Sequence, residues 1–98
     1  MPPLHKYGFE ASVLTAPWTP FTGRRKVAGI VVGNSNASSD TVTVTDSSGA
    51  TLFVFRMPAT GTLRYEPAEP VDFPSGMTFT ASAQPGSVIV SLISTRNL

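Results

Sequence analysis

Residues 41–55 of the chain, TVTVTDSSGATLFVF, decide its fold class. Thr and Val alternate over 41–45, which is typical of a strand with one buried and one wet face. Asp46-Ser47-Ser48-Gly49 has the composition of a hairpin turn, with Gly49 in the left-handed region of backbone space. A second apolar run follows at once, so this stretch predicts an antiparallel β-hairpin.

The same pattern of short strands and turns continues on both sides of this hairpin. Further strands are expected at residues 27–33, 62–65, 77–83 and 87–94, with a short edge piece at 71–73. No window shows a 3.6-residue apolar period with helix caps. The sequence therefore predicts an all-β fold, an antiparallel β-sandwich of jelly-roll or immunoglobulin-like type.

The first quarter of the chain has a different composition. Residues 1–26 hold four of the nine prolines, and each proline fixes φ and removes a backbone donor. Only residues 11–15 resemble a strand. We expect residues 1–26 to form an extended N-terminal arm with one possible short strand, and residues 27–98 to form the sandwich domain.

Some of the expected strands are apolar on both faces, namely those containing residues 30–32, 52–55 and 88–90. The outward set must be covered, either by the arm or by another subunit. The expected sandwich domain is also short, and the chain has no cysteine for a disulfide. Oligomerisation is the remaining usual means of stabilisation, so we predict that the protein assembles.

Composition limits the classes of function. The 98 residues carry a net charge of +1 with only 13% charged side chains, which favours neither nucleic acid nor an anionic membrane as a partner. No apolar run reaches the ~18 residues of a membrane span, and the start lacks a signal-peptide core. We expect a soluble protein made in a cytoplasm and not exported by the usual route.

The sequence offers little for catalysis. His5, the single histidine, lies among prolines rather than on a strand, and the carboxylates fall mainly in turns and loops. There is no Gly-rich phosphate loop and no cluster of metal ligands. We therefore expect no enzyme activity, no cofactor, no metal and no small-molecule substrate.

The candidate site is a protein-binding surface on the arm. Its expected apolar anchors are Leu4, Tyr7, Phe9, Trp18 and Phe21. Arg24-Arg25-Lys26, the one run of basic residues, is expected to dock on an acidic partner. Two alternatives stay open: the arm folds back on its own sandwich, or the basic residues are simply solvated.

Several segments together carry a resemblance to a family. These are residues 26–34 (KVAGIVVGN), 41–49 (TVTVTDSSG), 58–61 (PATG) and 73–82 (FPSGMTFTAS). The chain resembles small β-sandwich virion proteins of tailed bacteriophages, of the capsid decoration or cement type, over roughly residues 9–94.

The resemblance implies a structural protein that bridges neighbouring subunits on the capsid exterior after assembly in the host cytoplasm. It further implies a homotrimer that contacts the major capsid protein or other virion subunits. The alternative is a tail or receptor-binding module that recognises a cell-surface glycan, with Trp18 or Tyr65 as an aromatic platform. An enzyme fragment is the third hypothesis, and no acid–base pair supports it.

Overall fold

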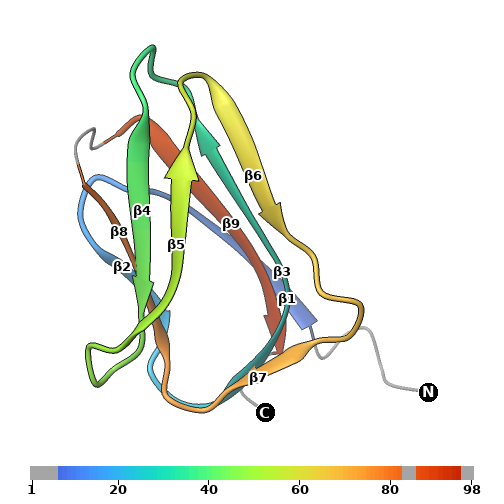
Figure 1. Cartoon of the computed structure of the whole chain (residues 1–98). Coiled ribbons are helices and arrows are strands. Elements are labelled where there is room, and N and C mark those ends of the chain that lie inside the picture. The colour runs from blue at the N-terminus through green and yellow to red at the C-terminus, as the bar shows by residue number, and fades with distance from the viewer. Residues whose placement is uncertain (1–6, 83–85, 96–98) are drawn as a thin grey trace.

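The computed structural model describes residues 7–82 and 86–95, which form strands and no helix (Figure 1). The strands are β1 (Tyr7–Val13), β2 (Trp18–Phe21), β3 (Arg25–Asn34), β4 (Asp40–Thr45), β5 (Thr51–Met57), β6 (Gly61–Tyr65), β7 (Val71–Phe73), β8 (Met77–Ala81) and β9 (Val88–Thr95).

These strands form two sheets that face each other. Sheet A is five-stranded, with the order β1-β9-β3-β6 and with β7 also paired to β3. Sheet B is four-stranded, with the order β2-β8-β4-β5. Every pairing is antiparallel. The predicted fold class, an all-β antiparallel sandwich, is confirmed.

The β4–β5 hairpin has the predicted form. Val42 and Val44 are fully buried, and the threonines between them face outward. Gly49 has φ 89°, which is the left-handed conformation expected at this turn. The Asp46 carboxylate closes the turn by accepting hydrogen bonds from the Ser48 amide at 2.9 Å, the Ser48 hydroxyl at 2.6 Å and the Ala50 amide at 3.0 Å.

The structure differs from the expected arm at residues 1–26. Residues 7–26 lie in the sandwich: β1 pairs with β9 along its whole length, and β2 pairs with β8. Proline did not prevent this, because Pro17 lies between the strands and Pro20 lies in β2, an edge strand where a missing N–H is tolerated. Leu4 and His5 lie outside the described residues.

The core lies between the two sheets. Phe79 is the largest fully buried side chain, and Ile30, Val32, Leu92 and Val90 are also inaccessible to water. Strands β3 and β9, which read as apolar on both faces, supply their even-numbered residues from 30 to 32 and from 88 to 92 to this core. Their odd-numbered residues therefore point to the outer face of sheet A.

Candidate functional site: an apolar outer face and a free strand edge

Strand β1 turns its apolar side chains away from the sandwich. Phe9, Ala11 and Val13 are exposed, whereas Glu10 and Ser12 are half-buried on the side of the opposite sheet. An edge strand whose apolar residues served only its own core would show the reverse pattern, with Phe9, Ala11 and Val13 facing the opposite sheet. A shift of the register by one residue would exchange the two faces in this way. The observed register thus leaves this apolar set in water.

Large apolar side chains pair across β1 and β9 on this outer face. Phe9 lies opposite Ile93, and Val13 lies opposite Ile89. Their exposed fractions are 68% for Phe9, 43% for Ile93, 44% for Val13 and 48% for Ile89. We call these four residues the apolar stripe; the Ala11–Ser91 pair lies between its two halves.

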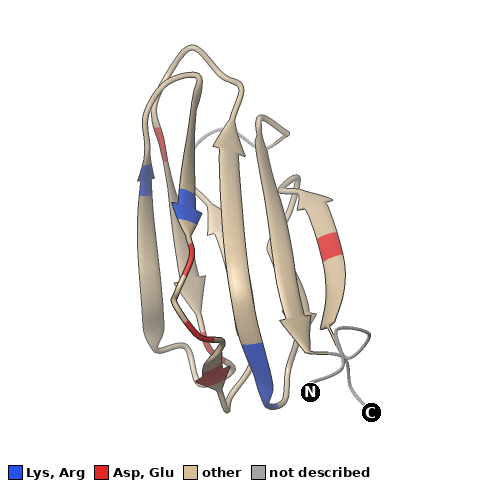
Figure 2. Ribbon diagram, turned by 90° about the vertical axis from the view of Figure 1, so that its right-hand side faces the viewer, with Lys and Arg blue, Asp and Glu red and all other residues tan. Residues whose placement is uncertain are grey.

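The stripe continues onto a flat part of β3. Gly29 lies opposite Ile93 and Gly33 lies opposite Ile89, so no side chain rises beside the stripe at either position. Figure 2 shows this face with β1 at its right-hand edge, and no charged residue lies along the length of β9. The part of this face formed by β1, β9 and the glycines of β3 is therefore level and uncharged, and Arg64 on β6, opposite Val31, borders it. Surfaces of this kind are used by proteins for contacts with other proteins.

The outer face of sheet B has the opposite character. Threonines line β4 and β8, and the pairs Thr43–Thr80 and Thr45–Thr78 lie directly across from each other. The Thr19 and Thr78 hydroxyls are 2.8 Å apart and hydrogen bonded. Val54 on β5, 46% exposed, is the one large exposed apolar residue among the described part of this sheet. Only sheet A therefore presents an apolar outer surface.

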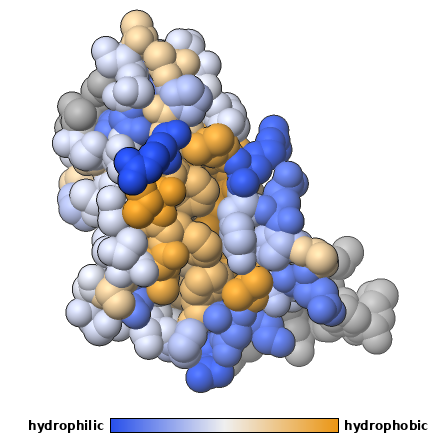
Figure 3. All heavy atoms as spheres, in the orientation of Figure 1, coloured by the Kyte–Doolittle hydropathy of each residue, from blue (hydrophilic) through white to orange (hydrophobic). Residues whose placement is uncertain are grey.

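A second apolar area covers the open side of the sandwich between β5 and β6. Figure 3 shows it in the middle of the view, bordered by hydrophilic residues. Phe53 is at its centre, with ring-centroid distances of 4.8 Å to Tyr65, 5.7 Å to Phe73 and 6.0 Å to Phe55. These rings pack against the core, so this area closes the sandwich.

The aromatic anchors expected from the sequence have different surroundings. Trp18 is half-buried and stacks on Phe79 at 5.6 Å, while Phe21 is only 5% exposed. Tyr7 is half-buried at the start of β1, and Phe9 remains open to solvent. The structure thus places Phe9 on the apolar stripe, and Trp18 and Phe21 against the core.

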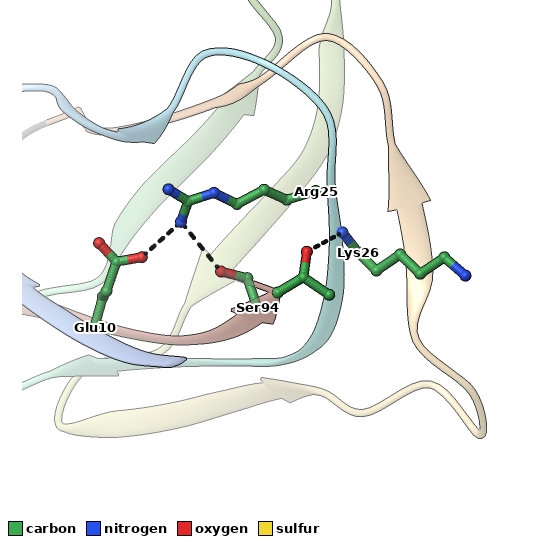
Figure 4. Close-up of polar contacts among 5 residues, drawn as sticks. Glu10, Arg25, Lys26 and Ser94 are labelled. Atoms are coloured by element: carbon green, nitrogen blue, oxygen red, sulfur yellow. Dashed lines mark hydrogen bonds and ion pairs between the residues drawn. The ribbon is translucent and has the colours of Figure 1, made fainter. Parts of the chain in front are cut away.

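Arg25 fastens β1 to the rest of the sandwich. Its guanidinium donates to the Glu10 carboxylate at 3.0 Å and to the Ser94 hydroxyl at 3.5 Å (Figure 4). The same group lies 5.2 Å from the centre of the Phe21 ring. Because Arg25 is only 21% exposed, it joins β1, β2, β3 and β9 from inside the end of the sandwich.

The other two basic residues also have contacts within the chain. Arg24, with a 69% exposed side chain, forms an ion pair with Asp72 at 2.7 Å. The backbone amide of Lys26 donates to the Thr95 hydroxyl at 2.9 Å, and the Lys26 side chain is exposed. The structure therefore separates the basic run into a half-buried Arg25, which links four strands, and two solvent-facing cations, Arg24 and Lys26.

A shallow hollow of about 240 Å³ lies at one end of the stripe. Ile89, Gly33, Thr62 and Ser87 are among its lining residues, together with Thr60. Thr60 has φ 50°, which is rare for a β-branched residue, and its amide donates to the Asn36 carbonyl at 2.9 Å. This bond between two loops holds the turn before β6 in place.

Charge chemistry among the described residues is limited. Within residues 7–82 and 86–95, no three His, Cys, Asp or Glu side chains gather as metal ligands would. Hydrogen bonds, the largest from the Ser48 hydroxyl, lower the pKa of Asp46 below its ordinary value. No helix capable of crossing a membrane occurs in the same part of the chain.

The remaining members of the stripe were not among the residues predicted to bind a partner. Ile89 had a usable signal, because residues 88–90 read as apolar on both faces. Val13 and Ile93 carried no such signal, because residues 1–26 were expected to form an arm. Their importance depends on the β1–β9 register, which the sequence alone did not provide.

The chain is thus an all-β sandwich with exposed apolar side chains on the outer face of sheet A. No protein-family model matches it, and no curated protein is detectably similar in sequence.

Among solved structures, the chain is similar to the NLP core of Drosophila at a TM-score of 0.51. The two share 15% identity, with 92% of this chain and 98% of that chain covered. A chain of the virus-like particle of the prawn Macrobrachium rosenbergii extra small virus aligns at a TM-score of 0.45 and 14% identity, covering 92% and 75%. At these identities the similarity concerns the fold alone.

Proposed function

We propose that this protein is a non-catalytic structural subunit that docks through the outer face of sheet A on other protein subunits. The carrying observation is the apolar stripe: Phe9 and Val13 on β1 pair with Ile93 and Ile89 on β9, and all four are at least 43% exposed. A partner that covers these side chains removes apolar surface from water at about 25 cal/mol per Å².

The contrast between the two sheets supports docking by one face. The outer face of sheet B carries hydroxyl-bearing threonines, which water solvates well, whereas β9 has no charged side chain at all. The NLP core, which shares the fold, is described in terms of pentamer formation. A sandwich of this kind can therefore serve as a building block of an oligomer.

The finer part of the proposal follows the resemblance to phage decoration proteins. We place the protein on the exterior of a virion, where it would bridge major capsid protein or other virion subunits without cofactor, substrate, membrane or nucleic acid. The glycan-binding alternative gains nothing from Trp18 and Tyr65, because both rings pack against the core.

The test compares two matched surface variants. Ile93→Lys places a charge in the stripe, and Val54→Lys places one at an equally exposed position on sheet B. Each variant is expressed in cells that produce the virions, and the number of copies of the protein per gradient-purified virion is counted by quantitative mass spectrometry. Circular dichroism of each purified variant checks that it folds.

We expect wild type and Val54→Lys to remain on the particles and Ile93→Lys to be lost. Retention of Ile93→Lys at the wild-type level would refute docking through sheet A. Absence of the wild-type chain from the particles would refute the virion assignment. Deleting residues 1–26 is not a suitable test, because it would remove both β1 and β2 from the sandwich.

A further inference from the structure

Within residues 7–82 and 86–95, strand β1 has one unpaired edge. Among the described residues β9 is its sole neighbour in sheet A. Leu14, the residue after the strand, donates its amide to the Val88 carbonyl at 2.8 Å, so its backbone faces β9. Since backbone groups alternate along a strand, those of Phe9, Ala11 and Val13 face away from β9. The Val13 carbonyl agrees, because it accepts from the Thr15 amide at 2.9 Å.

This edge has little of the usual protection against pairing. Natural edge strands are blocked by proline, lysine, bulges or inward-pointing charges. Strand β2, at the edge of sheet B, has both Pro20 and a register shift. Strand β1 has no proline, no lysine and an unbroken register. Its one charge, Glu10, is balanced by Arg25 of the same chain at 3.0 Å.

We infer that β1 pairs with β1 of a second copy of this chain, antiparallel, about a two-fold axis at Ala11. Phe9 of each copy then lies opposite Val13 of the other, and Ala11 lies opposite its own equivalent. All of these residues have backbone groups directed at the free edge, so the Ala11 pair exchanges both N–H···O bonds. In each Phe9–Val13 pair the Val13 amide donates to the Phe9 carbonyl, whereas the Val13 carbonyl already accepts from the Thr15 amide of its own chain. Aromatic and β-branched side chains are favourable cross-strand partners.

Charge and length disfavour two alternative registers, with the axis at Glu10 or at Phe9. Residues directly opposite each other must lie on the same face, so the two-fold axis must pass through a residue of β1 and not between two residues. An axis at Glu10 would set two like charges against each other, whereas an axis at Ala11 sets Glu10 against Ser12. An axis at Phe9 would leave Val13 beyond the start of the partner's β1, which begins at Tyr7.

The area involved fits a modest but specific contact. At 68% exposure, Phe9 leaves on the order of 100–170 Å² of its side chain in water. Phe9, Ala11 and Val13 together are smaller than the ~800 Å² per partner of a standard interface. Backbone hydrogen bonds between the two β1 strands supply the rest of the binding free energy, as in other cases where a strand adds to a sheet edge.

This inference rests on the proposed function and deepens it, and the two share only Phe9 and Val13 of the apolar stripe. Pairing uses the edge of β1 and joins the two copies of sheet A into one continuous sheet. The two apolar stripes then lie side by side and face the same way, which doubles the surface available for docking. The arrangement closes at two copies, so it replaces the homotrimer that the resemblance implies.

Crosslinking provides the first test, because the chain has no cysteine of its own. Opposed residues in a hydrogen-bonded antiparallel pair have Cα atoms about 5.5 Å apart, within the range of a disulfide. Ala11→Cys should therefore form a disulfide-linked dimer under mild oxidation at least about tenfold faster than Val54→Cys, an exposed edge-strand control on sheet B. Equal rates, or a faster rate for Phe9→Cys, would overturn the assigned pairing.

Sedimentation velocity provides the second test. Ala11→Pro removes the edge-facing N–H while leaving the β1–β9 bonds intact, and Ala11→Ser keeps that N–H. Proline should raise the dimer dissociation constant by about tenfold or more, and serine should change it little. A wild-type monomer or trimer would overturn the inference. If Ala11→Pro does not fold, crosslinking decides.

Failure of this inference is distinguishable from failure of the proposed function. Ile93 lies one strand in from the free edge, so Ile93→Lys should leave the dimer intact while removing the protein from particles. A monomeric wild type that still needs Ile93 for retention would overturn only the pairing.

Discussion

Two neighbours on β9 should respond very differently to truncation. Leu92 is fully buried between the sheets, and Ile93, the next residue, is 43% exposed on the outer face. Leu92→Ala should lower the free energy of unfolding by about 3–4 kcal/mol, because it removes buried methyl groups and leaves a cavity. Ile93 buries little more than half of its side chain, so Ile93→Ala should cost about 1 kcal/mol.

Urea unfolding followed by fluorescence can measure this difference. Trp18 is the single tryptophan, and it stacks on Phe79 of the core, so its emission should report the loss of the sandwich. Dilute protein is required, since self-association would add to the apparent stability. If Ile93→Ala costs as much as Leu92→Ala in monomeric protein, the outward position of Ile93, and with it the apolar stripe, is refuted.

Three further predictions concern turns. Gly76→Ala should lower the unfolding free energy by about 2–3 kcal/mol and Gly49→Ala by about 1 kcal/mol in the same assay. Both glycines have positive φ, but a Cβ at Gly76 would lie 2.8 Å from a backbone oxygen, whereas a Cβ at Gly49 would contact no other atom. Equal losses of stability would contradict this prediction. Because the folded-state pKa of Asp46 is lowered, its contribution to stability is present above the unfolded pKa and lost as pH falls through the folded one. NMR titration should find this pKa below its ordinary value, and Asp46→Asn should flatten that acid-side loss; an ordinary pKa would refute the effect. Thr60→Asn should raise the unfolding free energy by roughly 0.5–1 kcal/mol, because asparagine tolerates φ 50° better than threonine; a lower midpoint would show that the threonine side chain is needed.

Local pattern was sufficient for most of the strands. Strand β7 has the predicted bounds, and β3, β4, β6, β8 and β9 differ from prediction at their ends. The inward positions of Val42 and Val44 were also correct. Strict alternation and strong turn residues specify these features within a few positions of the chain.

Long-range pairing explains what local pattern missed. Strand β1 pairs with β9, some eighty residues later in the chain, and no local signal specifies that register. Proline content suggested an arm, although Pro20 lies where an edge strand tolerates it. The expected arm also led to the prediction that Trp18 and Phe21 bind a partner, and the structure packs both against the core.

The threonine face of sheet B has a consequence for how far a coat could grow. If the apolar stripe docks as proposed, a bound molecule would expose sheet B, whose described outer face is lined by threonines and has Val54 as its one large exposed apolar residue. A further copy would find little apolar surface there to bind. Under the proposed function, binding should therefore stop at a single layer even when the protein is in excess.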